Sequence, residues 1–64
     1  MENLELVISE FIETENNVRH INVFHNTVED YYSVTFKEYG SRFRVPFKTF
    51  KSSEEAFNYG KSVK

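Results

Sequence analysis

The chain has 64 residues, a net charge of −2 and no cysteine. A chain of this length forms one domain and buries only about 60% of the surface that its unfolded form exposes. Seven phenylalanines and four tyrosines bring the aromatic share to 17%, which is unlike the composition of disordered segments. Without cysteine there is no disulfide framework and no thiolate metal site. We therefore predict a single domain over residues 1–64 with a core built around aromatic rings.

The same features favour a cytoplasmic protein. Small exported domains usually depend on disulfides, and the first residues include Glu2 and Glu5 where a signal peptide is basic. No apolar run approaches the roughly 20 residues that a membrane-spanning helix needs. We expect neither export nor contact with a membrane.

Two interpretations fit residues 2–17. Apolar residues at helical spacing form one stripe of an amphipathic helix, namely Leu4, Val7, Ile8, Phe11 and Ile12. Alternatively, the segment is a strand whose apolar side carries Leu4, Leu6, Ile8 and Ile12. We favour the helix, with a stop at Asn16 and Asn17. Its outer face then carries acidic residues that form a candidate binding face, namely Glu2, Glu10 and Glu13.

Three strand-like runs follow, over residues 18–25, 31–39 and 42–50. The second run has the cleanest alternation of the three, which is typical of a strand with one buried side. We predict that its inward side carries Tyr32, Val34 and Phe36.

The third run alternates as well, and we predict that its inward side carries Phe43, Val45 and Phe47. Pro46 lies in the middle of this run and cannot donate a hydrogen bond to a neighbouring strand. It therefore places the run at a sheet edge or marks a bulge. The inward residues of the second and third runs should share one core with Phe57.

The last segment has a clear helix start. The run from Ser52 to Glu55 matches a capping box, in which the serine hydroxyl accepts a hydrogen bond from the Glu55 amide and the Glu55 carboxylate reaches back. Gly60 costs roughly 1 kcal/mol in a helix interior, so it indicates either a close approach to a sheet or fraying of the helix. The side that faces the sheet should carry Ala56, Phe57, Gly60 and Val63.

The predicted fold class is therefore α+β. A small antiparallel three-stranded sheet is packed by a C-terminal helix, and residues 2–17 add an N-terminal helix or strand. If that segment is a strand, the sheet has four strands.

The sequence offers no constellation for catalysis. His20 and His25 are five residues apart, which places them on opposite faces of a strand and makes them poor partners for a metal ion. The sequence has no Gly-rich phosphate loop, no GxSxG motif and no HExxH motif. A domain this small also has little room for a substrate cleft. We predict that the protein is not an enzyme and holds no metal and no cofactor.

The outward side of the predicted sheet carries more information. It combines tyrosines with basic side chains, as do surfaces that contact phosphates and stack on bases. An ordinary half-exposed sheet has a similar composition, because tyrosines and long cations cover apolar neighbours there. The candidate binding residues on this face are Tyr31, Lys37, Tyr39, Arg42, Arg44 and Lys48.

Charge is divided unevenly along the chain. Residues 1–36 carry seven acidic side chains against Arg19 alone, a balance of −6, whereas residues 37–64 carry seven basic side chains against three acidic ones, a balance of +4. Such asymmetry indicates either two oppositely charged faces, one of which meets a charged partner, or two ordinarily solvated faces.

The junction between the third run and the helix resembles that of a known class of DNA-binding domain. Residues 47–56 read Phe-Lys-Thr-Phe-Lys-Ser-Ser-Glu-Glu-Ala and are similar to the strand-to-helix junction of the AP2 and phage-integrase N-terminal domains. In those families a three-stranded sheet lies in the major groove. The resemblance covers residues 18–64 and implies a DNA-binding sheet face. The chain departs from the pattern because it is acidic overall and its first strand carries a single cation.

Three functions follow from these observations. The favoured one is a regulator or inhibitor that docks on a larger protein, as many short phage and mobile-element proteins do, because a charge-split surface suits electrostatic steering. The alternative is a nucleic-acid-binding domain that uses the basic face of the sheet. The third is a homodimer paired along a sheet edge, although Pro46 disfavours pairing along its own run.

Overall fold

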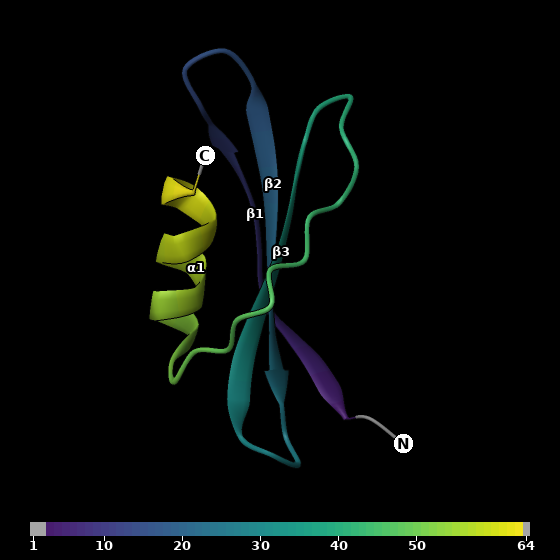
Figure 1. The fold of residues 1–64 in the computed structure, drawn as a ribbon, viewed down its shortest axis with the longest axis vertical. Helices are drawn as coiled ribbons and strands as arrows, with labels where there is room; N and C mark the ends of the chain where they lie inside the picture. Colours follow the sequence, from purple (N-terminus) through teal and green to yellow (C-terminus); the bar gives the residue numbers. More distant parts are fainter. Residues whose placement is uncertain (1–2, 64) are drawn as a thin grey trace.

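A computed structural model describes residues 3–63 of the chain. It contains strands β1 (Leu4–Glu13), β2 (Val18–Asn26) and β3 (Tyr31–Glu38), followed by one helix, α1 (Ser53–Ser62). The strands form an antiparallel sheet in the order β1-β2-β3, and α1 packs on one side of it (Figure 1). The α+β prediction of a small antiparallel sheet with a C-terminal helix is confirmed.

The N-terminal segment is a strand, so the helix that we favoured there is wrong. β1 pairs with β2 from Leu4 opposite Asn26 to Glu13 opposite Val18. The Asn16-Asn17 stop belongs instead to the turn between these two strands, where the Thr14 amide donates to the Asn17 carbonyl at 2.7 Å. A strand satisfies the apolar pattern of this segment as well as a helix does, and only the strand gives the inner edge of β2 a partner.

A β-bulge at Val7 shifts the side-chain alternation of β1, so even-numbered residues before and after it lie on opposite faces of the sheet. Leu6 lies opposite Phe24, whereas Ile8 lies opposite Val23, so one extra residue is inserted in β1 between these pairs. Directly paired residues share a face of the sheet. Leu4 and Leu6 therefore lie on one face and Ile8 and Ile12 on the other, so the strand alternative that placed all four together is also wrong.

Residues 39–51, called the crossing segment below, run from the end of β3 across its outer edge to the start of α1 (Figure 1). The segment makes two isolated bridges with β3, Phe36 with Arg44 and Tyr32 with Phe50. The interval from Arg44 to Phe50 is longer than the interval from Tyr32 to Phe36, and Pro46 lies within it. The regular strand predicted over residues 42–50 is therefore wrong, whereas an edge position and an irregularity at Pro46 are confirmed.

The core lies between the sheet and the helix. Its fully buried apolar residues are Ile21, Val23, Val34, Phe36 and Ala56. Tyr32, Phe50 and Phe57 are partly buried against them. The inward side predicted for β3 is thus confirmed.

The inward side predicted for the crossing segment is wrong. Phe43 is 55% exposed, Val45 is 65% exposed and Phe47 is fully exposed. The segment passes around the edge of β3 instead of continuing the ladder, so its alternation does not follow the two faces of the sheet.

The predicted capping box marks the start of α1. The Ser52 hydroxyl accepts a hydrogen bond from the Glu55 amide at 3.2 Å, and the Glu55 carboxylate accepts one from the Lys51 amide at 3.3 Å. Toward the other end, Gly60 lies so close to the sheet that a Cβ atom there would be 3.0 Å from Ile21 Cγ2 and 3.2 Å from Val34 Cγ2. Of the two roles predicted for Gly60, the close approach is confirmed.

Candidate binding faces of the sheet

The sheet has two unequal faces. The helix face is covered by α1, whereas the other, called the open face below, is not. Cross-strand pairing fixes which residues the open face carries. From β1 it carries Leu4, Leu6, Ser9, Phe11 and Glu13, from β2 Val18, His20, Asn22, Phe24 and Asn26, and from β3 Tyr31, Ser33, Thr35 and Lys37.

One end of the open face is an aromatic cluster around His20. The ring of Phe11 stacks on the His20 ring with 4.2 Å between centroids, and His20 Nε2 lies 2.9 Å from the Ser9 hydroxyl. Lys37 lies beside this pair in the register and extends over the ring of Phe43 in the crossing segment, 5.5 Å from its centroid. Phe11, His20 and Lys37 border a shallow hollow of about 270 Å³, which Tyr39 also lines.

The other end of the open face also has a hollow, of about 410 Å³. It lies between Leu4, Tyr31 and Ser33 of the sheet and the stretch of the crossing segment that includes Pro46 and Phe47. The crossing segment therefore borders the open face near both ends of β3, and it presents one phenylalanine at each.

Large apolar side chains are exposed on and around the open face. Phe11 is 72% exposed, Tyr39 is 84% exposed and Phe47 is fully exposed, while Leu4, Leu6 and Phe43 are about half exposed. Single exposed apolar side chains are ordinary on a protein surface, but a group on one face indicates an interaction site.

The structure divides the six candidate residues of the basic face. Tyr31 and Lys37 lie on the open face, Tyr39 lines the hollow at one end, and Arg42 is exposed in the crossing segment. The other two, Arg44 and Lys48, turn toward the helix side.

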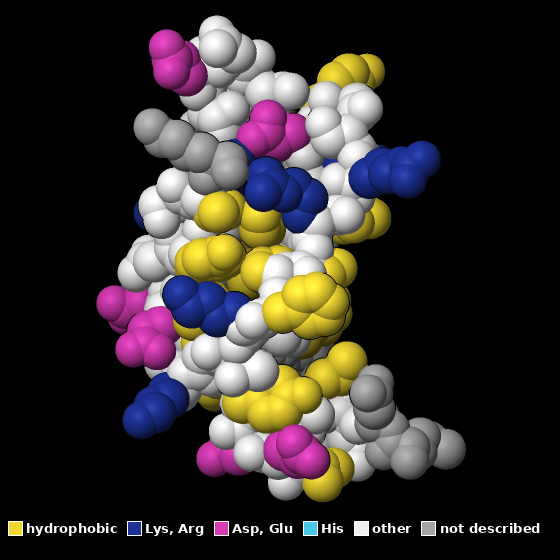
Figure 2. All heavy atoms as spheres, in the orientation of Figure 1, with side chains coloured by type: hydrophobic (Ala, Val, Ile, Leu, Met, Phe, Trp, Pro, Cys, Tyr) yellow, Lys and Arg dark blue, Asp and Glu magenta, His cyan; other side chains and the backbone are white. Residues whose placement is uncertain are grey.

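The two cations on the helix side contact aromatic rings. The guanidinium of Arg44 lies 5.0 Å from the centroid of the Phe36 ring, and Lys48 Nζ lies 5.0 Å from that of Tyr59 and 5.9 Å from that of Phe50. Figure 2 shows basic side chains interspersed with hydrophobic ones on the side of the molecule that carries α1 and the crossing segment. These cations cover core rings, and Lys48 also lines the hollow beside Tyr31 at one end of the open face.

The candidate acidic face is also divided. Glu2 lies outside the described residues. Glu10 pairs with Ile21 on the helix-face side, whereas Glu13 pairs with Val18 on the open-face side. Three residues along a helix share a face, but three residues along a strand do not. The acidic face that depended on a helix is therefore not formed by Glu10 and Glu13.

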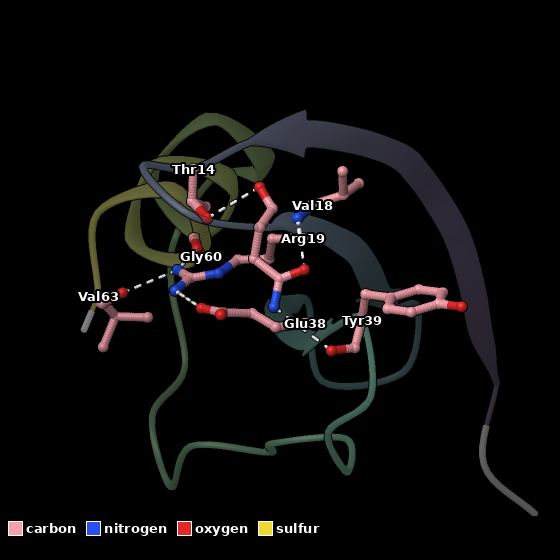
Figure 3. Close-up of polar contacts among 8 residues, drawn as sticks. Thr14, Val18, Arg19, Glu38, Tyr39, Gly60 and Val63 are labelled. Carbon is pink, nitrogen blue, oxygen red and sulfur yellow. Dashed lines mark hydrogen bonds and ion pairs between the residues drawn. The ribbon is translucent and has the colours of Figure 1, made fainter.

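Arg19 occupies a buried polar site under the end of α1 (Figure 3). Its side chain is 4% exposed, and its Nη1 donates hydrogen bonds to the carbonyls of Gly60 and Val63, both at 2.7 Å. Its Nη2 pairs with the Glu38 carboxylate of β3, and its Nε has no hydrogen-bond partner among the described residues. The guanidinium supplies donors to carbonyls that the helix end leaves free, so Arg19 ties α1 to two strands and is a structural group.

The two histidines lie on opposite faces, as their spacing predicted. His20 belongs to the aromatic cluster, whereas His25 stacks on Tyr32 with centroids 4.4 Å apart and contacts Asp30 at 2.8 Å. Among residues 3–63 no group of three or more His, Cys, Asp or Glu side chains is placed to hold a metal ion. Within the same residues, no helix has the length and apolar character needed to cross a membrane.

No protein-family model, curated protein or solved structure matches this chain. The sequence pattern did not indicate the apolar residues on and around the open face, which are Leu4, Leu6, Phe11, Phe43 and Phe47. One signal could have indicated them. The chain has more large apolar side chains than a single face of a three-stranded sheet can bury under a ten-residue helix.

Proposed function

We propose that this protein is a non-catalytic binding module that docks on another protein through the open face. The observation that carries this proposal is the gathering of exposed apolar side chains on a face that no element of residues 3–63 covers. Protein interfaces are enriched in aromatic residues, and a few such anchors supply most of the binding energy. Phe11, Phe47 and Tyr39 are the three most exposed candidates for such anchors.

The placement of the cations favours a protein over a nucleic acid. Nucleic-acid affinity rests largely on basic side chains that neutralise phosphates. Lys37 lies on the open face and Arg42 close to it in the sequence, but Arg44 and Lys48 contact rings on the helix side. An aromatic platform with fewer cations suits an apolar protein surface better than a phosphate backbone.

A regulator or inhibitor acting in the cytoplasm, of the kind that phages and mobile elements encode, is the role that we propose for such a module. A sheet face with apolar hollows at both ends can cover a site on a larger protein without chemistry of its own. The charge imbalance between the two halves of the chain would steer the encounter with that protein.

A capture experiment with matched variants tests the proposal. The double variant Phe11→Ser/Phe47→Ser removes two anchors that are largely exposed, so the fold should persist. Val45→Ser removes an apolar side chain that is also more than half exposed but borders the helix side, next to Phe36 and Tyr59. We expect proteins captured from the native host by the unchanged chain to be lost with the double variant and retained with Val45→Ser. Equal capture by all three chains would overturn the proposal.

Nucleic acid is the second candidate function, because the resemblance to AP2 and integrase N-terminal domains implies it and the open face offers rings for stacking. Fluorescence anisotropy with random duplex and single-stranded oligonucleotides at 0.15 M salt decides between the two. We expect no binding. Micromolar, salt-sensitive binding that is abolished by Lys37→Glu/Arg42→Glu would replace the protein partner with a nucleic acid.

A further inference from the structure

The two outer edges of the sheet differ. The edge of β3 is covered by the crossing segment, whose Arg44 and Phe50 exchange backbone hydrogen bonds with Phe36 and Tyr32 at 2.8 to 3.1 Å. β1 forms the opposite edge, and no other element of residues 3–63 pairs with its outer side. An uncovered edge strand presents backbone donors and acceptors that can pair with another chain.

The hydrogen-bond pattern identifies the free backbone groups of β1. Successive residues of an antiparallel strand direct their backbone groups to opposite edges, and Tyr32 and Phe36 direct theirs away from β2. Carrying this alternation through the paired residues to β1 leaves five residues with outward backbone groups. They are Leu4, Leu6, Ser9, Phe11 and Glu13.

We propose that this edge of β1 binds an extended segment of a partner protein as an added strand, and that the segment alternates apolar and basic residues. On the open-face side an added strand would lie beside Leu6 and Phe11, which are 55% and 72% exposed. On the helix-face side it would lie beside Glu10 and Glu5, which are exposed carboxylates. An apolar residue suits the first side and a lysine or arginine suits the second.

The negative charge of β1 favours a basic segment of a partner protein over a second copy of the same chain as the added strand. β1 carries Glu5, Glu10 and Glu13 and no basic residue. Pairing two β1 edges would gather six carboxylates along one seam, and like charges close together across strands are unfavourable. A basic strand instead gains from Glu5 and Glu10, which lie on the side that its lysines or arginines occupy. The same carboxylates and the bulge at Val7 disfavour pairing of the β1 edge with that of a second copy.

This inference goes beyond the proposed function, because its main-chain hydrogen bonds come from the backbone of β1 and not from the rings of the open face; Phe11 borders both surfaces. The protein could bind a partner through the open face without the edge of β1, or through that edge without the open face. Strand addition derives its affinity from main-chain hydrogen bonds and its specificity from alternate side chains, so the two surfaces respond to different substitutions.

The experiment titrates the whole chain with a synthetic decapeptide of alternating lysine and valine, followed by NMR and calorimetry. We expect saturable binding, with the largest amide shifts at Leu4, Leu6, Ser9, Phe11 and Glu13. Ser9→Pro removes one outward N–H but no hydrogen bond to β2, and it should weaken binding about tenfold, which corresponds to the loss of roughly one hydrogen bond. Ser9→Ala also loses the hydroxyl contact with His20 but keeps the N–H, so it should bind within about twofold of the unchanged chain.

Two further probes keep the test decisive if Ser9→Pro fails to fold. A lysine-valine peptide methylated on the amide nitrogens that face β1 should not bind, and a glutamate-valine peptide should bind at least about tenfold more weakly. Val45→Ser should leave peptide binding unchanged, because this exposed residue lies in the crossing segment, on the side of β3 away from β1. No binding up to millimolar peptide, equal binding of the methylated or acidic peptide, or amide shifts confined to the crossing segment would each overturn the proposal.

Discussion

The two faces of the sheet are built from the same three strands and differ in what lies over them. On the helix face Ile21 and Val23 are completely buried, and α1 approaches so closely that a Cβ atom at position 60 would lie 3.0 Å from Ile21 Cγ2. On the open face Phe11 and Leu6 are more than half exposed. Apolar residues occur on both faces, so apolar character alone did not decide which face became the core. The helix face became the core because α1 covers it.

Residues on the two faces also contribute to different free energies, those on the helix face to folding and those on the open face to binding. A buried phenylalanine on the helix face contributes to folding through contacts that water would otherwise replace. An exposed phenylalanine on the open face, such as Phe11, keeps most of its contact with water in the free protein. Its hydrophobic free energy is therefore available only when another surface covers it. Substitution on the first face should cost stability, and substitution on the second should cost binding.

The largest contrast is expected between Phe36→Ala and Phe47→Ala. Phe36 is 2% exposed and Phe47 is fully exposed. Loss of a buried phenylalanine side chain costs about 3–5 kcal/mol, which is comparable with the whole stability of a domain this small. Phe47→Ala should stay within about 0.5 kcal/mol of the unchanged chain. Urea unfolding followed by circular dichroism measures both, and similar midpoints for the two variants would show that the faces are wrongly assigned.

Local signals in the sequence predicted several elements correctly. The capping box at Ser52 and the alternation of Tyr32, Val34 and Phe36 both depend on neighbouring residues, and both appear in the structure. The histidines were placed on opposite faces by their odd spacing alone. In the candidate site, the same parity correctly placed Tyr31 and Lys37 on the face away from the helix.

Elements that depend on distant partners were not predictable in this way. The apolar residues of β1 fit a helical period and a strand period equally well. The strand forms because the backbone groups along one edge of β2 need hydrogen-bond partners. Arg44 and Lys48 were expected beside the tyrosines because a regular strand was expected through Pro46. The irregular crossing of residues 39–51 instead carries both to the helix side. The extra residue at Val7, which transfers Leu4 and Leu6 to the open face, has no signature of its own in the sequence.

Gly60→Val tests the close approach that makes the helix face a core. The added Cβ would lie 3.0 Å from Ile21 Cγ2 and 3.2 Å from Val34 Cγ2, and both neighbours are β-branched and buried, so neither can move easily. We expect a loss of about 1–3 kcal/mol in the free energy of unfolding. Asn58→Ala, at an exposed position of the same helix, is the control and should be neutral or slightly stabilising. A stabilised Gly60→Val would mean that α1 lies farther from the sheet.

The smallest change in the free energy of unfolding that still distinguishes the two faces is expected from Ser52→Ala. The Ser52 hydroxyl accepts the hydrogen bond of the Glu55 amide at 3.2 Å, and loss of such a cap costs about 1 kcal/mol. Ser53→Ala, one residue farther along, is the matched control and should leave the urea midpoint almost unchanged.

Because the cap holds the start of α1, which covers the helix face, weakening the cap should loosen that face selectively. Amide hydrogen exchange in Ser52→Ala should therefore accelerate most in α1, whereas peptide or protein binding at the open face and at β1 should persist as long as the chain is folded. If Ser52→Ala instead weakened binding and left the exchange of α1 unchanged, the helix would belong to the binding surface and the division of the sheet into a structural face and a binding face would be wrong.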